Sequence, residues 1–97
     1  MATRMHNPPH PGEILQDTVL AEVRLSVSEF ARKLGVSRVV LWRVVKSRTA
    51  VSTDMALRQA AALGGSAKSW LQMQAAYDLW HAAKKRRPKV QPLKLAA

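Results

Sequence analysis

The residues with the most informative chemistry lie in a stretch that opens at Ser37 and contains no helix-breaking residue before Lys46. Because an α-helix repeats every 3.6 residues, a helix that buries Leu41 and Val44 turns the intervening side chains outward. An arginine can donate two parallel hydrogen bonds to O6 and N7 of guanine, and a valine can contact the methyl group of thymine. We therefore expect this face to read bases in the major groove of double-stranded DNA, through Arg38, Val39 and Arg43.

Short polar and basic residues flank the same stretch and suit contacts with phosphates, which fix the register on a duplex without reading its sequence. The candidates are Ser37, Lys46, Ser47, Arg48 and Thr49. Trp42 also faces outward in this arrangement. It either stacks on the DNA backbone, joins a protein interface or folds back on the domain, and the sequence leaves all three open.

The charge balance favours a polyanionic partner. The chain has 16 Lys and Arg residues against 6 Asp and Glu residues, a formal net charge of +10 at pH 7. Between Phe30 and Val51 there are six basic residues and no acidic one. Nucleic acid, an acidic protein or an anionic membrane surface would each match such an excess. A solvated basic surface on an unrelated helical bundle is the alternative interpretation.

A sharp corner before Ser37 is predicted to position the reading helix. Ser26 and Glu29 have the spacing of a capping box and open a short helix that Gly35 can end in a left-handed conformation. Ala31 is small where two helix backbones would approach, and apolar anchors stand on both sides of the corner. These anchors are Phe30, Leu34, Val36, Leu41 and Val44. The pattern is typical of a helix-turn-helix motif.

Three further helices are expected around this motif. Pro11 suits the first turn of a helix, and the apolar residues after it mark an inner face: Ile14, Leu15, Val19 and Leu20. Ser52 caps another helix, which ends at Gly64-Gly65 and has a predicted inner face of Ala56, Leu57, Ala60 and Leu63. Ser66 caps the last. The sequence therefore predicts an all-α, compact five-helix bundle without strands.

An aromatic stripe follows from the spacing of large residues in the last helix, namely Trp70, Met73, Tyr77 and Trp80. Core packing accounts for part of such a stripe. Its distal end, Tyr77 and Trp80, either completes the core or forms a homodimer contact, and we assign those two residues to a dimer interface.

The chain divides into an N-terminal arm (1–9), a helix-turn-helix domain with a C-terminal dimerisation helix (10–83) and a basic tail (84–97). The tail contains the run Lys84-Lys85-Arg86-Arg87-Pro88-Lys89 and is expected to be solvated when unbound. It is either plain solubilising charge or a contact for DNA or a partner protein. The last four residues resemble a vector junction and carry little weight.

Several classes of function are disfavoured. No cysteine is present, and His6, His10 and His81 are too scattered for a metal site. The sequence has neither a glycine-rich phosphate loop nor a nucleophile with a base beside it, so we expect no cofactor, no metal and no enzymatic activity. Without an apolar stretch long enough to span a bilayer, and without a signal-peptide pattern, we expect a cytosolic protein that does not contact the membrane.

Beyond the motif, three stretches between about residues 10 and 79 resemble HigA-type antitoxins, a branch of the phage-repressor-like helix-turn-helix proteins. They are His10-Pro11-Gly12-Glu13-Ile14-Leu15, then Asp54 with Ala56-Leu57-Arg58 and Ala60, and finally Trp70-Leu71 with Gln74 and Tyr77-Asp78-Leu79. The resemblance implies a lambda-repressor-like fold and a dimer that represses its own operon at a palindromic operator. It also implies a partner toxin, typically a small ribonuclease, that the protein neutralises.

The chain departs from this pattern on the reading face. Val39, Val40 and Trp42 are apolar where polar residues are usual, and Ser47 replaces a glycine. The operator sequence therefore cannot be borrowed from the family. A stand-alone transcriptional regulator remains the alternative function, and an interaction module that no longer binds specific DNA is a further one.

Overall fold

In a computed structural model, which describes residues 7–94, the chain is helical and has no strand within that range. α1 (Pro11–Ile14), the π-helical turn η1 (Leu15–Leu20) and α2 (Ala21–Val23) run on as one segment. They are followed by α3 (Val27–Leu34), α4 (Arg38–Val45), α5 (Thr53–Leu63) and α6 (Ala67–Ala83). With the first segment counted as one helix, the predicted all-α class is confirmed.

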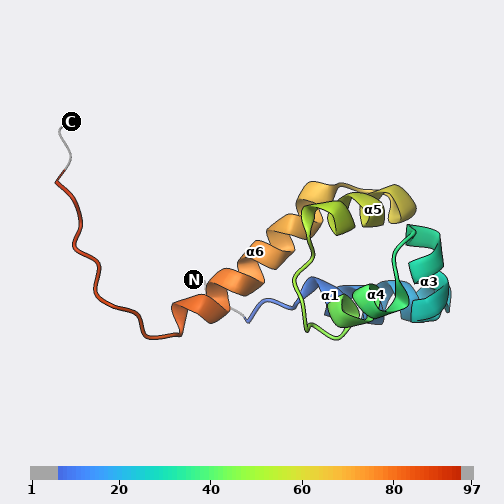
Figure 1. The fold of residues 1–97 in the computed structure, drawn as a ribbon, viewed down its shortest axis with the longest axis horizontal. Coiled ribbons are helices and arrows are strands. Elements are labelled where there is room, and N and C mark those ends of the chain that lie inside the picture. Colours follow the sequence, from blue (N-terminus) through green and yellow to red (C-terminus); the bar gives the residue numbers. More distant parts are fainter. Residues whose placement is uncertain (1–6, 95–97) are drawn as a thin grey trace.

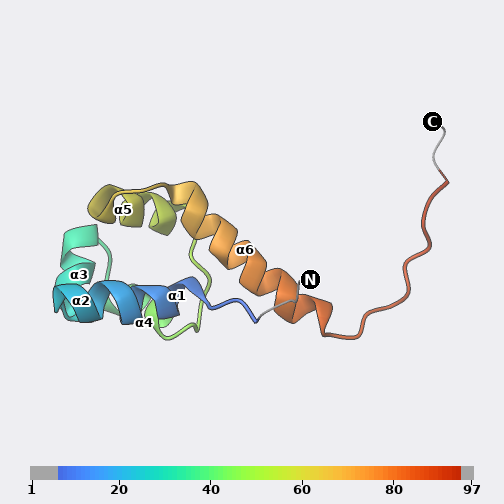
Figure 2. The same cartoon turned by 180° about the vertical axis from the view of Figure 1, so that it is seen from behind.

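The helices enclose one core (Figures 1 and 2). α1 packs on α4, α3 packs on both α4 and α5, and α5 lies against α6. α6 starts beside α5, runs obliquely past the N-terminal end of α1, and leads into a tail that extends away from the helices (Figure 1). No helix within residues 7–94 is long and apolar enough to cross a membrane. Of the two chain ends, residues 1–6 of the predicted arm, with His6, and residues 95–97 of the predicted vector junction lie outside the described residues.

The first helix begins at a capping box built on His10. Its Nδ1 accepts a hydrogen bond from the Gly12 N–H at 2.9 Å, and its own N–H donates to the Glu13 carboxylate at 3.3 Å. The ring is buried, with 2% of the residue exposed, and packs edge-on against Tyr77 of α6 with a centroid distance of 4.8 Å. His10 thus joins the start of the fold to its last helix.

The stability of the fold is expected to fall as the pH drops below about 6.5, because burial lowers the pKa of His10 from its usual 6.5 despite the opposing influence of Asp78, the Thr49 backbone and Glu13. A proton on Nδ1 would also replace the acceptor that the Gly12 N–H needs. In this pH range the unfolded chain binds the proton more readily than the folded one, so protonation favours unfolding. The free energy of unfolding from urea titrations at pH 7.5 and pH 5.5 measures this loss.

His10→Asn supplies the control for that measurement, since an asparagine oxygen can cap the helix and does not titrate. Its stability should change less between the two pH values than that of the wild type. An equal loss in both proteins would assign the pH dependence to groups other than His10.

A π-helical turn interrupts the first helix, which sequence periodicity alone did not predict. Leu15 and Leu20 are both buried although they stand five positions apart. In regular α-helical geometry two such residues point about 140° apart, whereas the wider π turn brings them to the same side. Thr18 lies within this turn, and its hydroxyl donates to the Ile14 carbonyl. The predicted inner face is otherwise confirmed, with Ile14 and Val19 half-buried.

The predicted corner is confirmed. Ser26 Oγ accepts from the Glu29 N–H at 3.1 Å, and the Glu29 carboxylate accepts from the Ser26 N–H at 2.9 Å. Gly35 ends α3 with φ of 74°, a left-handed conformation that glycine adopts without steric cost. Phe30, Ala31 and Leu34 are buried behind it, so α3 and α4 meet as the motif requires.

The predicted inner face of α5 was wrong in part. Leu57 is 57% exposed and Leu63 38% exposed, while Met55, Ala56 and Gln59 are buried. The helix is rotated so that Met55 rather than Leu57 meets the core, and a polar glutamine occupies a core position. The apolar pattern misled because Leu57 and Leu63 are among the most hydrophobic side chains of this helix.

Candidate nucleic-acid interface

α4 presents the predicted reading face. Its inner side is anchored by Leu41, Val44 and Val45, each at most 3% exposed. Its first turn is capped by Ser37, whose Oγ accepts from the Val40 N–H at 3.2 Å. Anchored and capped in this way, the helix has a fixed rotation about its axis, which decides which side chains face out.

The three predicted base-reading residues lie on the exposed side of α4. Arg38 and Arg43 are exposed, and Val39 is 50% exposed. Together with Trp42 they line a hollow of about 440 Å³. These side chains are therefore accessible from outside the domain, and their assignment to bases stays a prediction.

The loop after α4 is held against the end of that helix. The N–H groups of Arg48 and Thr49 both donate to the Arg43 carbonyl, at 2.7 and 3.3 Å. Ser47 has φ of 59°, in the left-handed region, which explains why a glycine suits this position. Arg48, Thr49 and Lys46 are exposed and Ser47 is half-buried. Together with Ser37 at the other end of α4, the predicted phosphate-binding residues thus flank the reading face, and their role stays a prediction.

Trp42 does not stand free in solvent. It is 36% exposed, and the guanidinium carbon of Arg48 lies 5.6 Å from the centroid of its ring. Such a contact between a cation and an aromatic face is worth about 0.5–1 kcal/mol at an exposed site. In this conformation Trp42 therefore holds Arg48 beside α4, a positioning role that the sequence did not suggest.

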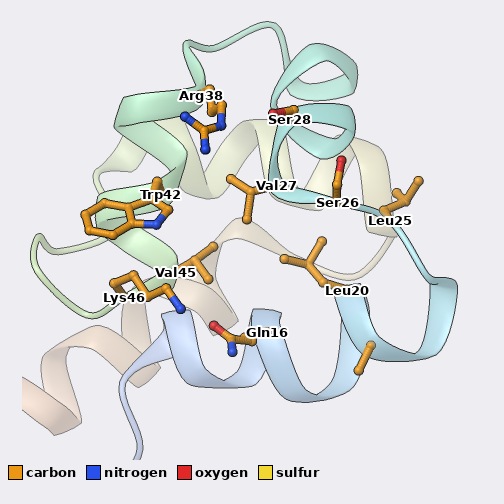
Figure 3. A pocket seen from close by; sticks show the side chains of 11 residues that line it. Gln16, Leu20, Leu25, Ser26, Val27, Ser28, Arg38, Trp42, Val45 and Lys46 are labelled. Atoms are coloured by element: carbon orange, nitrogen blue, oxygen red, sulfur yellow. The ribbon is translucent and has the colours of Figure 1, made fainter.

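A groove of about 550 Å³ runs beside the reading helix, between the first helical segment and the start of α3 (Figure 3). Its sides carry apolar groups from three helical elements and from the loop before α3: Leu20, Val27, Val45 and Leu25. Trp42 and Lys46 lie along one edge, Arg38 and Ser28 lie at one end, and Gln16 lies at the other end, near Lys46 in this view (Figure 3). Among the residues that the structure describes, no acidic one lines this groove, so the positive character of the reading face continues along its flank.

Arg58 of α5 braces the corner from behind. One of its terminal nitrogens donates to the Leu34 carbonyl at 2.8 Å and to the Gly35 carbonyl at 3.3 Å. Its Nε pairs with Asp54 at 2.7 Å. The last carbonyls of a helix have no partner inside it, so this arginine stabilises the end of α3. The sequence signal was the Asp54 and Arg58 pair at a spacing of four.

The chain is similar to curated bacterial proteins over most of its length. It is 43% identical over 70 residues to virulence-associated protein I of Dichelobacter nodosus, of whose length it covers 65%. It is 33% identical over 81 residues to the HTH-type transcriptional regulator YddM of Escherichia coli K12, covering 84% of this chain and 85% of that protein. No protein-family model matches the chain.

Solved antitoxin structures share the fold. Antitoxin GraA superposes with a TM-score of 0.78 at 33% identity, covering 87% of this chain and all of that one. The antitoxin HigA of Pseudomonas aeruginosa, solved with the higBA promoter, has a TM-score of 0.75 at 39% identity, covering 77% of this chain and 82% of that one. The chain belongs to the HigA-type family of DNA-binding helix-turn-helix antitoxins. This family consists of regulators and not of enzymes, as the sequence predicts.

The aromatic stripe of this HigA-type chain divides between core and surface. Trp70 is buried, and Tyr77 is half-buried because its ring packs on His10 and, at 4.3 Å, on His81. Trp80 is half-buried, and the neighbouring Leu79 is 70% exposed. The assignment of Tyr77 and Trp80 to a dimer interface remains a prediction, and Leu79 joins them as an apolar side chain that the helical spacing did not single out.

Within residues 7–94, no three His, Cys, Asp or Glu side chains are grouped closely enough to hold a metal ion. His10 and His81 both pack on Tyr77 beside a small hollow, and among the described residues Glu13 is the only carboxylate that lines this hollow. The side chains exposed on and beside α4 are cations, short polar groups and apolar groups.

Proposed function

We propose that two copies of this chain bind a palindromic operator and repress the operon that encodes them. The chain would also neutralise a partner toxin, a ribonuclease encoded beside it, and act in the cytoplasm. A two-fold dimer presents two reading helices about one DNA turn apart, which gives a short motif affinity and selects a palindrome.

One observation carries this proposal: Arg38, Val39 and Arg43 project from one side of a helix whose other side is anchored in the core. Direct readout suits this arrangement, because the exposed arginines can bind guanine and the valine beside them can contact the methyl group of thymine. The HigA of P. aeruginosa and GraA, both similar to this chain, have been solved with a promoter and with an operator, respectively.

The test compares the chain's own upstream region with a random duplex of the same length and salt concentration. A sequence-specific binder should prefer the upstream region by about 10³-fold or more. Equal affinity for both duplexes would reject the proposal that the chain is a sequence-specific repressor. For the toxin, co-expression with the adjoining reading frame should yield a complex. Without such a frame or complex, the chain is a stand-alone regulator.

Arg43→Ala should weaken binding to the upstream region by about 1–3 kcal/mol and relax selectivity at one base pair, because alanine cannot make the bidentate hydrogen bonds to guanine. Affinities for a set of single-base operator variants provide the measurement. Val40→Ala is a suitable control, since it removes an exposed apolar group of the same helix without removing charge. Uniform weakening on every duplex would make Arg43 a phosphate contact instead.

A second function has its own observation. Val39, Val40 and Trp42 are 50%, 45% and 36% exposed, an apolar surface that is unusual on a DNA-reading helix. An interaction module would use such a surface to bind protein. In that case, rising salt would abolish binding to upstream and random DNA alike.

A further inference from the structure

We propose that the basic tail, residues 84–94, binds the phosphate backbone of duplex DNA as a second contact, separate from the reading helix. This inference rests on the proposed function for the identity of the DNA. It adds that affinity and selectivity are carried by different parts of the chain, since phosphate contacts hold a duplex without reading its sequence.

The charge of the tail is not neutralised within the described residues. Six of its residues are basic and none is acidic: Lys84, Lys85, Arg86, Arg87, Lys89 and Lys94. Every residue from Ala82 to Lys94 is exposed. Across residues 7–94 the only ion pair joins Arg58 to Asp54, far from this segment in the chain. A concentrated positive charge that no carboxylate of the described residues pairs with is available to a polyanion.

The start of the tail is fixed to the end of α6 by two cations. Lys84 Nζ lies 3.5 Å from the centroid of the Trp80 ring, and the Arg87 guanidinium donates to the Ala82 carbonyl. Cations are favoured at the C-terminal end of a helix, where the macrodipole is negative. These contacts set the direction in which the remaining tail leaves α6, away from the helices (Figure 2).

The tail can follow a duplex over a useful distance. Pro88 and Pro92 each restrict φ and favour extended backbone, and no residue from Pro88 to Lys94 has regular secondary structure. An extended segment rises about 3.1 Å per residue, so residues 88–94, beyond the part fixed to α6, reach roughly 20 Å, more than half a turn of DNA. Along that length a duplex carries one negative charge about every 1.7 Å, so it offers more phosphates than the tail has basic residues.

DNA is favoured over other polyanions because the reading helix of the same molecule would already hold it. Tethering turns the second contact into an intramolecular event with a high effective concentration. An acidic protein has no such advantage. The same argument predicts that the tail strengthens binding to every sequence that the chain can bind.

The test measures affinity of the full-length chain for its upstream region and for random duplex between 50 and 300 mM salt. In the variant Lys85→Gln with Arg86→Gln, the slope of log K against log[salt] should become shallower by about 0.9 for each phosphate that the tail no longer neutralises, up to about 1.8 per protomer. Both duplexes should lose affinity together, so their ratio should stay within about twofold of the wild-type ratio.

Two controls separate tail charge from other effects. The swapped variant Lys85→Arg with Arg86→Lys keeps the charge and should keep the wild-type slope. Lys68→Gln, at the opposite end of α6, removes one charge away from the tail and should leave the slope nearly unchanged. If the tail variant changes the slope no more per charge than Lys68→Gln does, the tail does not bind DNA. If the wild type binds the upstream region and random duplex equally well, the proposed repressor function is rejected. The salt slopes would still decide whether the tail binds DNA.

Discussion

Gly12→Ala is expected to cost on the order of 3 kcal/mol or more of unfolding free energy. A Cβ atom at this position would lie 1.8 Å from the Val44 carbonyl oxygen and 2.8 Å from its carbon. Both are backbone atoms of α4, so the clash cannot be relieved by turning a side chain. α1 would have to retreat by about an ångström and disturb the His10 cap and the buried base of the reading helix. Urea unfolding followed by circular dichroism measures the loss.

Gly65→Ala is the control for this substitution. Gly65 has φ of 79°, and nothing lies within 4 Å of the Cβ that an alanine would add there. Its expected cost, about 1 kcal/mol, comes from the left-handed backbone alone. A Gly12→Ala protein as stable as Gly65→Ala would mean that α1 and α4 are not in close backbone contact. If Gly12→Ala loses its helical signal and Gly65→Ala does not, the result agrees with close backbone contact between α1 and α4.

The corner and the reading helix could be predicted because they depend on local chemistry. Ser26 with Glu29, Gly35 and Ser37 act within a few residues of their own positions, and the caps and the left-handed turn follow from their side chains. The exposed side of α4 followed from the burial of Leu41 and Val44. Local rules therefore sufficed for the elements that carry the candidate site.

Contacts between distant segments could not be predicted in the same way. Gly12 touching Val44, and Arg58 reaching the Leu34 carbonyl, each join residues more than 20 positions apart. Gly12 stood out only as part of a resemblance, without the steric reason that the structure supplies. The rotation of α5 likewise depends on how α3 and α6 pack on it, which no single helix pattern contains.

Arg48 illustrates the same limit within the site. Its charge and its place after α4 suggested a phosphate contact, but its position beside Trp42 depends on a loop that folds back on the helix. The sequence offered three roles for Trp42 and no means to choose among them. The contact with Arg48 favours the role in which the indole lies against the domain.

Gln59→Leu should raise the unfolding free energy by about 1–3 kcal/mol. The side chain of Gln59 is completely buried, and neither its Oε1 nor its Nε2 has a hydrogen-bond partner within the described residues. A buried polar group without a partner costs roughly that amount, and leucine removes it while filling a similar volume. For a domain of this size, each kcal/mol shifts the melting temperature by about 4–8 °C. A thermal melt therefore resolves the gain.

The same substitution at Gln74 should have the opposite sign. Gln74 is 6% exposed, its Oε1 accepts from the Val51 N–H at 2.9 Å, and its Nε2 donates to Asp78 at 2.9 Å. Gln74→Leu leaves the N–H of Val51, a residue only 3% exposed, without its acceptor, so the expected loss is about 1–3 kcal/mol. Because both changes replace a buried glutamine by leucine, side-chain hydrophobicity alone would move the two melting temperatures in one direction. Opposite shifts therefore identify hydrogen bonding as the cause, whereas two gains would show that the link between α6 and the segment before α5 adds nothing to stability.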